Sequence, residues 1–374
     1  MRPRAPWISV LISLALASLA QAGAPPGARP SAGLSPEEAL GKRIFFDEAL
    51  SSPAGQSCAT CHMPQAGFAG NGAADIAVYE GAVKGRFGDR NPPSSAYASF
   101  SPPFAKNAEG QYVGGQFWDG RAATLEEQAK GPFLNPAEQN LPDARALVDR
   151  VCQAAYGAQF KKLYGDAACS EPARGYDAVA RAVAAYERSA ESNRFSSKYD
   201  LARAGKVRLS EQEKRGVRLF DGKAKCARCH PSGPGPNNAP PVFTDFTYDN
   251  IGLPKNPKNP HYTTTPELNP EGAAHVDLGL GGALEDPAQH GKFKVPTLRN
   301  VAVSPPYGHN GCFRTLEDIV RFYNTRDLSG KWPAPEVKQN MNTAELGDLG
   351  LTEAEVADLV AFLKTLTDGY AAPK

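Results

Sequence analysis

Two copies of one five-residue pattern, CATCH at residues 58–62 and CARCH at residues 226–230, constrain this chain more than any other feature. Two thiols at this spacing can add to the two vinyl groups of one porphyrin, and the adjacent histidine can reach the iron from one side. The alternative, a structural zinc site, needs four protein ligands at each place, and neither pattern is followed by a second cysteine pair or a nearby histidine. The sequence therefore predicts two covalently bound haem c groups, held by Cys58, Cys61 and His62 and by Cys226, Cys229 and His230.

The first 22 residues have the layout of a cleavable signal peptide. Arg2 and Arg4 precede an apolar run over residues 7–19, and AQA follows at residues 20–22. A membrane span is the alternative, but the run is short for a bilayer and ends in a cleavage-type site. We therefore expect export to the periplasm and no membrane span after cleavage. Cleavage removes two positive charges and no negative charge, so the formal charge changes from +1 to −1, which gives no sign of a nucleic-acid-binding surface.

The segments around the two patterns resemble each other weakly, as expected of a duplicated haem-binding domain. Ser35 and Ser210 are each placed to cap a helix, and each is followed three residues later by a glutamate, Glu38 or Glu213, in a capping-box pattern. We expect a mainly α fold of two cytochrome c-like haem domains with long irregular loops. The predicted domains span residues 35–195 and 205–370. Packing of the last helix on the first domain is compatible with this division.

Apolar spacing predicts further helices over residues 144–164 and 176–188, and a last helix that begins after Thr352 and turns Val356, Leu359, Val360 and Leu363 inward. Residues 231–272 are rich in proline, glycine and asparagine and predict a long loop around a buried cofactor.

The number of axial ligands at each haem iron distinguishes an enzyme from an electron carrier. An enzyme needs an iron with an open position, whereas a carrier fills both axial positions. The four histidines outside the two patterns all follow the second one: His261, His275, His290 and His309. Met63 is adjacent to the first proximal histidine and cannot easily reach the opposite face. The first haem thus has no sixth ligand of the usual kind, which favours an enzyme.

Five segments make the chain similar to the bacterial di-haem cytochrome c peroxidase and MauG superfamily. They are ALGKRIFFDEALS before the first pattern, RNPPS at 90–94, FWDGRAATLEEQAKGPFLNPAEQN at 117–140, FKVPTLRNVAVSPPYGHNG at 293–311 and TLEDIV at 315–320. They follow the family's order over nearly all of the mature chain. The resemblance implies a two-domain helical oxidoreductase, with a high-spin, peroxide-binding haem in the N-terminal domain and a six-coordinate haem in the C-terminal domain.

The resemblance also carries catalytic roles onto matching positions. Glu138 corresponds to the acid-base glutamate of the peroxide site, since breaking the O–O bond requires a group that moves a proton between the two oxygens. Gln128 and Pro132 match that distal pocket, and Trp118 matches a tryptophan between the haems that can relay an electron. From the residues alone, Glu138 would be an exposed loop carboxylate and Trp118 a core aromatic. Gln139 departs from the peroxidases, in which a methionine commonly follows the glutamate.

A calcium ion is also implied. Asn91 and the backbone oxygens of Ser304 and Pro306 match the positions that hold an interdomain calcium in the family, and oxygen ligands suit this hard cation.

Tyr323 is the residue on which the two branches of the family differ. Its helix is capped by Thr315, and spacing alone makes it a core aromatic that shares the inward face with Leu316, Ile319 and Val320. By the resemblance, it stands where di-haem peroxidases carry the methionine ligand of the second haem and MauG-like enzymes carry a tyrosine. A phenolate stabilises oxidised iron, whereas a thioether favours reduced iron. We expect Tyr323 to bind the second iron, with Met341 as the rival ligand.

Three cysteines remain outside the two patterns. Cys152 and Cys169 flank a helical segment and are expected to pair in an oxidising compartment. Cys312 is then the odd cysteine, and we interpret it as a buried thiol and not as a nucleophile.

Three functions stay open. The first is a MauG-like enzyme that reduces hydrogen peroxide, shares the oxidising equivalents between both haems and oxidises a partner protein, typically at tryptophan. The second is a cytochrome c peroxidase that detoxifies peroxide with electrons from a small cytochrome c or cupredoxin, and the third is a di-haem electron carrier. Classical peroxidases carry a histidine after the first pattern that blocks the first haem, and residues 63–117 contain none. This absence and Tyr323 favour the first function.

Overall fold

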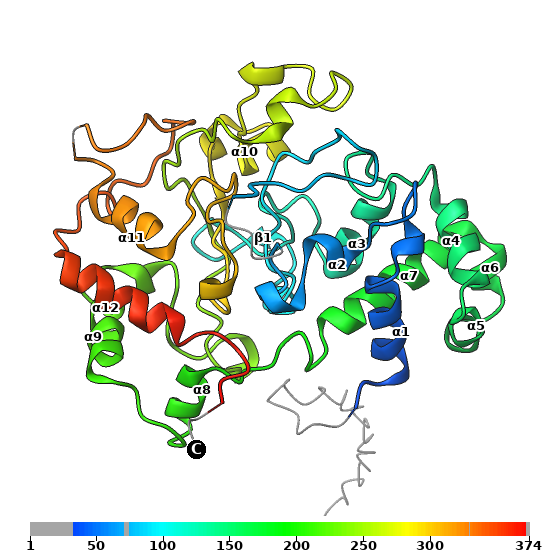
Figure 1. Cartoon of the computed structure of the whole chain (residues 1–374), viewed down its shortest axis with the longest axis horizontal. Helices are drawn as coiled ribbons and strands as arrows, with labels where there is room; N and C mark the ends of the chain where they lie inside the picture. The colour runs from blue at the N-terminus through cyan, green and yellow to red at the C-terminus, as the bar shows by residue number, and fades with distance from the viewer. Residues whose placement is uncertain (1–32, 71–74, 329, 372–374) are drawn as a thin grey trace, which may run out of the picture.

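The computed structural model describes residues 33–70, 75–328 and 330–371, so the predicted signal peptide lies outside the described residues. The prediction of a mainly α fold is confirmed (Figure 1). The α-helices are α1 (Pro36–Phe45), α2 (Cys58–Cys61), α3 (Leu125–Leu134), α4 (Ala144–Gln153), α5 (Gly157–Tyr164), α6 (Ala167–Ser170), α7 (Pro172–Glu187), α8 (Lys198–Arg203), α9 (Glu211–Asp221), α10 (Leu280–Leu284), α11 (Leu316–Thr325) and α12 (Glu353–Lys364). Two antiparallel pairs of very short strands add β1 (Ala105–Lys106) with β2 (Tyr112–Val113) and β3 (Tyr248–Asp249) with β4 (Phe293–Lys294).

The helices gather around two hydrophobic cores, one in each lobe of the molecule in Figure 1. Helices α1, α3, α4 and α7 enclose the first core, whose large buried side chains include Phe45, Phe133, Phe160 and Tyr186. Helices α9, α11 and α12 enclose the second, with Phe220, Phe243, Phe322 and Phe362. Val242 and Phe246 follow the second haem pattern yet pack in the first core, so the chain crosses between the lobes. The predicted domain boundaries stay a prediction.

Local sequence signals account for the helix ends. The capping boxes predicted at Ser35 and Ser210 are present, and Thr352 caps α12 in the same way. Helix α12 buries the four predicted apolar residues against α9 and α11. After α12, Asp368 accepts a hydrogen bond of 2.7 Å from the Tyr97 hydroxyl of the first core.

The helical structure predicted over residues 144–164 is present but is divided into two helices, because the chain breaks between α4 and α5. Ala154 is extended, and α5 then begins with Gly157. A Cβ atom on Gly157 would lie 2.2 Å from the carbonyl oxygen of Cys152, so only glycine allows this close approach. The loop predicted over 231–272 is irregular apart from β3 and short 3₁₀ turns.

A buried arginine joins the two lobes. Both terminal nitrogens of the Arg299 guanidinium donate to the Asp200 carboxylate, at 2.6 and 2.8 Å. The Arg299 side chain is fully buried. It lies over the rings of Tyr97 and Phe195 at the first core and of Phe243 at the second, with centroid distances of 4.9 to 5.6 Å. Arg299 therefore contacts aromatic rings of both cores and ties them together. Separating the cores would expose or unpair a buried charge, which is strongly destabilising.

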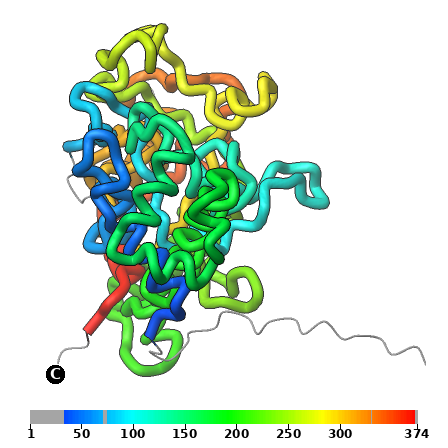
Figure 2. Tube along the Cα trace, turned by 90° about the vertical axis from the view of Figure 1, so that its right-hand side faces the viewer, coloured from blue at the N-terminus to red at the C-terminus, as the bar shows by residue number. Residues whose placement is uncertain are grey.

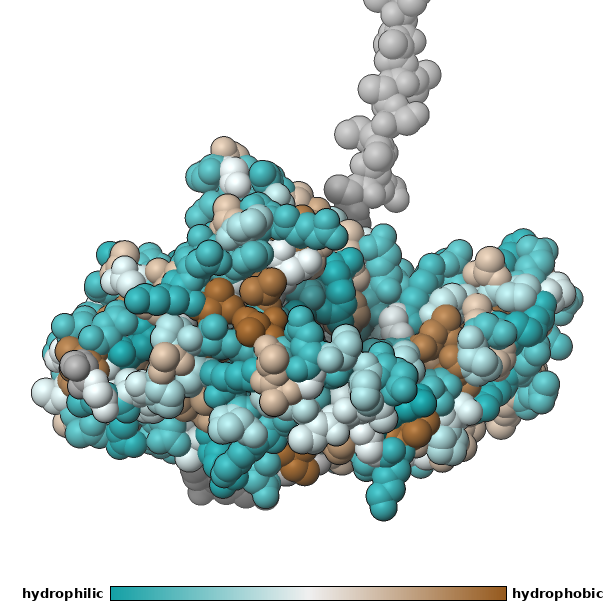
Figure 3. All heavy atoms as spheres, turned by 90° about the horizontal axis from the view of Figure 1, so that it is seen from above, coloured by the Kyte–Doolittle hydropathy of each residue, from teal (hydrophilic) through white to brown (hydrophobic). Residues whose placement is uncertain are grey.

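The surface carries one extended feature and scattered apolar areas. The β1–β2 hairpin, cyan in Figure 2, stands out from the body of the protein. On the face seen in Figure 3 the brown, apolar areas are small and separate, so this face offers no broad apolar docking surface among the described residues. None of the helices in the described ranges is long and apolar enough to cross a membrane.

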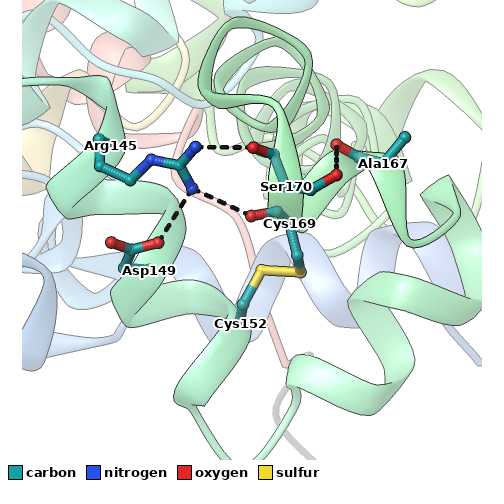
Figure 4. The surroundings of a disulfide bond; sticks show 6 residues. All are labelled: Arg145, Asp149, Cys152, Ala167, Cys169 and Ser170. Atoms are coloured by element: carbon teal, nitrogen blue, oxygen red, sulfur yellow. Dashed lines mark hydrogen bonds and ion pairs between the residues drawn. A yellow bond between two sulfur atoms is a disulfide. The ribbon is translucent and has the colours of Figure 1, made fainter.

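The predicted pairing of Cys152 with Cys169 is present in the structure and links the end of α4 to α6 (Figure 4). Arg145 of α4 supports the same junction, because its guanidinium donates to the carbonyl oxygens of Cys169 and Ser170 at 3.2 and 2.7 Å. These carbonyls end α6, where a positive charge is favourable. Cys312 is a half-buried thiol against the second core, and burial raises its pKa to about 11.

We predict that replacing Cys152 and Cys169 together by serine lowers the free energy of unfolding by about 3 kcal/mol, as expected for a bond that closes a loop of this length. Urea unfolding followed by circular dichroism measures this loss, and the haem absorption spectrum should stay that of the parent. An unchanged urea midpoint would show that the bond adds nothing to stability.

Candidate functional site

The first haem pattern forms a short helix with a fixed histidine after it. Helix α2 carries Cys58 and Cys61, and the Thr60 hydroxyl accepts a hydrogen bond from the Ser57 amide at its start. His62 follows the helix, and its Nδ1 lies 2.9 Å from the carbonyl oxygen of Phe68. Burial lowers the pKa of His62, so the ring is neutral at neutral pH and keeps a lone pair for a metal.

The second pattern repeats this geometry in the other lobe. Residues Cys226–Arg228 form a 3₁₀ turn, and Nδ1 of His230 lies 2.8 Å from the carbonyl oxygen of Phe243. Burial lowers the pKa of His230 to about 4. Phe68 and Phe243 both have left-handed backbones, with φ of 59° and 54°, which is unusual for a bulky residue. A carbonyl that fixes Nδ1 leaves Nε2 as the nitrogen for iron.

One cavity, called the inner cavity here, lies at the first pattern and brings together the residues that the sequence predicted for the peroxide site. Its lining includes Cys58, Cys61, His62, Asn91, Trp118, Gln128, Pro132 and Glu138. These residues come from α2, from the loop before α3, from α3 itself and from the turn after it. The arrangement places His62 and the carboxyl group of Glu138 on the walls of one space.

Glu138 is positioned by a tight turn at the end of α3. The Asn135 side chain donates to its carboxylate at 2.7 Å, and the Glu138 amide donates to the Asn135 carbonyl at 3.0 Å. Burial raises the pKa of Glu138, against the opposing effects of Asn135 and the positive charge of Arg121. A half-buried carboxyl with a raised pKa is suited to accept and return a proton.

Gln139 also belongs to this wall. Its side chain is buried, lines the inner cavity and donates to Cys58 Sγ at 3.6 Å. The glutamine that departs from the family pattern therefore makes this side of the cavity polar.

Trp118 connects the inner cavity with the loop over residues 293–311. Its indole nitrogen donates to the Asn91 carbonyl at 2.7 Å, and its ring meets His309 edge to face at 6.5 Å between centroids. The Lys294 amide donates to the Trp118 carbonyl at 2.8 Å. The tryptophan thus lies where the two halves of the chain touch.

Asn91 and Pro306, two of the residues matched to the family's calcium site, are in direct contact. The Asn91 side-chain nitrogen donates to the carbonyl oxygen of Pro306 at 2.8 Å and to that of Gly308 at 3.3 Å, so both carbonyls accept from a hydrogen-bond donor here. Ser304 precedes Pro306 in the same loop. Carbonyl and amide oxygens are ligands that suit calcium.

Tyr323 of α11 faces the second haem pattern. Tyr323 is half-buried and packs against the second core together with Cys226, and desolvation raises the pKa of its phenol, helped by the nearby Cys226 and Cys229. Met341, the rival ligand, lies near Gly252, since a Cβ atom there would be 2.5 Å from its sulfur, and it pairs with Asn250 in an isolated bridge. The ligand of the second haem stays a prediction, with Tyr323 close to Cys226 and Cys229.

Unpaired polar atoms support a polar cofactor in the inner cavity. Four buried atoms without a hydrogen-bond partner among the described residues belong to its lining: Gln56 Oε1, Ser95 Oγ, Gln139 Oε1 and Glu187 Oε2. Buried polar groups normally have partners. The Ser95 hydroxyl, and Glu187 when protonated, can donate to a haem propionate, whereas the two glutamine oxygens accept only and need another donor.

Sequence reasoning missed Gln56 and Glu187. Glu187 has a signal that could have been found, because it stands four residues after Val183 on the buried face of α7, where a charged residue is out of place. Burial raises its pKa to about 8. Gln56 lies in an irregular loop and has no comparable signal.

A third group of potential metal ligands, Cys229, Asp249 and Glu345, lies close together in the described part of the chain. Because Cys229 belongs to the second haem pattern, we assign this group to the haem site.

Comparisons with known proteins agree with this geometry. Residues 35–208 match the family of di-haem cytochrome c peroxidases. The methylamine utilization protein MauG of Paracoccus denitrificans is 43% identical over 347 residues, which is 88% of each chain. The cytochrome-c peroxidase IdrP1 of Denitromonas iodatirespirans is 31% identical over 346 residues, covering 88% of this chain and 81% of that protein.

The fold is similar to solved structures of the same kind. The diheme peroxidase BthA of Burkholderia thailandensis superposes with a TM-score of 0.78 at 34% identity, covering 90% of this chain and 87% of that chain. The chain therefore belongs to the di-haem cytochrome c peroxidase family, whose members are oxidoreductases that act on peroxide and carry two haem c groups.

Proposed function

We propose that this protein is a periplasmic, MauG-like di-haem peroxidase. It reduces hydrogen peroxide at the N-terminal haem and uses the two oxidising equivalents, shared with the second haem, to oxidise a partner protein. The observation that carries this proposal is Tyr323, whose half-buried side chain lies near Cys226 and Cys229 of the second pattern. The 43% identity to a MauG protein supports the same branch of the family.

Each haem would be held by its two cysteines and one histidine, His62 in the first site and His230 in the second. A bound haem supplies an iron that binds peroxide and takes part in electron transfer. Reduction of one hydrogen peroxide to two waters takes up two electrons and two protons. The chain's own contribution is to fix the ring nitrogens and to handle the protons.

Glu138 is the group that handles the proton between the peroxide oxygens. Its carboxylate takes the proton from the near oxygen and delivers it to the departing oxygen, which leaves as water when the O–O bond breaks. Asn135 fixes the carboxylate through its 2.7 Å hydrogen bond. Gln128 and Pro132 of α3 close the cavity on the same side and limit the space for water.

Trp118 relays electrons between the two sites. It lines the inner cavity, and its contacts with Lys294 and His309 reach the half of the chain that carries the second pattern. A calcium ion held by oxygens of Asn91, Ser304 and Pro306 would hold this junction rigid, because these residues come from both halves of the chain and lie close together.

A second candidate is peroxide detoxification with electrons from a small cytochrome c or cupredoxin. It is favoured by the similarity to cytochrome-c peroxidase IdrP1. The two candidates differ at the second haem, because a peroxidase that accepts electrons from a donor needs a higher potential there than a phenolate ligand allows. A third candidate, an electron carrier, would require the first iron to be closed on both sides.

We predict that Glu138→Gln slows the reaction with peroxide by about a hundredfold, because the amide cannot carry the proton between the oxygens. Stopped-flow absorption of the holoprotein after mixing with hydrogen peroxide measures the rate. Glu126→Gln is the matched control, since Glu126 is paired with Arg188. Glu126 lines neither the inner cavity nor the second cavity that lies beside it. Equal rates in the parent and Glu138→Gln would remove Glu138 from the mechanism.

Tyr323→Phe should change the electron paramagnetic resonance signal of the low-spin haem and raise the potential of the second haem, because the oxidised iron loses an anionic ligand. If Tyr323 only fills the core, phenylalanine keeps nearly all of its packing and both quantities stay at the parent value. That second result would contradict the MauG-like assignment.

Tyr323→Met should raise the potential of the second haem further than phenylalanine does, since a thioether favours reduced iron. Redox titration of the three proteins under the same conditions gives the order. A potential of the methionine variant at or below that of the parent would be incompatible with ligation at this position.

A further inference from the structure

A second cavity, called the outer cavity here, lies beside the inner one and has a volume of about 280 Å³. It is lined by Phe117, Arg121, Ala122, Glu127, Gly131, Asn135 and Glu138. Four of these residues also line the inner cavity: Phe117, Arg121, Asn135 and Glu138. The two spaces therefore share a wall, and Glu138 is part of it.

The outer cavity reaches the protein surface, because Arg121, Glu127 and Gly131 are exposed. About 10–15 Å³ suffices for one water molecule, so this space holds several waters or one small hydroperoxide. Its lining carries one cation, Arg121, and two carboxyl groups, Glu127 and Glu138. Because hydrogen-bond donors and acceptors both line the space, a neutral polar molecule such as a hydroperoxide finds partners on its walls.

We propose that the outer cavity is the route by which peroxide reaches Glu138, and that Arg121, lying on Phe117, sets the size of the hydroperoxide that can pass. The inference rests on the proposed role of the Glu138 site and adds a residue that determines specificity.

Arg121 is held in place at one end and exposed at the other. Its guanidinium lies 3.7 Å from the centre of the Phe117 ring and donates to Asp119 at 2.7 Å. Asp119 is fixed in turn by Arg90 at 2.6 Å, and Arg90 is paired on two nitrogens with Asp277. This buried chain of charges anchors the arginine over the ring, while its side chain remains 47% exposed.

Gly131 lies beside Phe117 in the lining of the outer cavity and is the point at which the route can be closed. It is exposed on α3, its backbone is helical, and the nearest atom to an added Cβ would be Phe117 Cζ at 3.4 Å. A side chain is therefore sterically allowed there and would extend into the outer cavity. Glycine within a helix is less favourable than alanine, so keeping this wall open gives the glycine a purpose.

The test compares the rates at which cyanide binds to the first haem of the holoprotein, followed by stopped-flow absorption in the Soret region. Gly131→Leu should slow cyanide association by about tenfold or more, because the leucine side chain fills the outer cavity. Gly131→Ala fills little of the space and should stay close to the parent rate. The resting absorption spectrum of each variant shows that the haem site itself is intact.

Arg121→Ala tests the size limit independently. It should raise the rate with tert-butyl hydroperoxide relative to that with hydrogen peroxide, because alanine covers less of the Phe117 ring than arginine does and leaves a wider passage. A parent that binds no cyanide would contradict the proposed function and this route together. Unchanged cyanide association in Gly131→Leu, or an unchanged rate ratio in Arg121→Ala, would contradict the route alone.

Discussion

The hydrogen bonds that hold His62 and His230 on backbone carbonyls are the constraint on which the rest of this structure depends. The accepting carbonyls belong to Phe68 and Phe243, and both residues adopt a left-handed backbone. Such conformations cost of order 1–3 kcal/mol each and persist only where the surroundings enforce them. Here both phenylalanine side chains are buried in a core, Phe68 in the first and Phe243 in the second. Core packing in each lobe therefore determines the orientation of the histidine that is proposed to bind iron.

The junction between the lobes is built from charges and aromatic rings that also reach the proposed catalytic groups. Arg90 joins Asp119, next to Trp118, to Asp277 in the other half of the chain, and the Asn91 carbonyl accepts the indole proton of Trp118. A shift of one lobe against the other would therefore disturb the proposed electron relay and the anchor of Arg121 at the same time. Buried ion pairs contribute little net stability but are costly to break, so this network specifies one arrangement of the two sites.

Much of the site could be predicted because it depends on short motifs. The cysteine spacing marks both haem sites, capping boxes mark the ends of α1 and α9, and the resemblance of segment 117–140 led to Trp118 and Glu138, which the structure brings to one cavity. Other features have no local signal. Nothing in the sequence around Phe68 or Phe243 indicates that these residues adopt a left-handed backbone. The break at Gly157 depends on the distance between Gly157 and the Cys152 carbonyl oxygen. Gln56 and Glu187 reach the inner cavity only through contacts between distant segments.

The central claim is that one chain holds one open iron and one iron closed by a tyrosine. Low-temperature magnetic circular dichroism of the resting oxidised holoprotein tests this most directly, because it reports the spin state and the axial ligands of each haem in one sample. The account predicts equal amounts of high-spin haem with a single histidine and low-spin haem with histidine and phenolate ligation. A spectrum of two low-spin haems, or of a low-spin haem with histidine and methionine ligation, would contradict it.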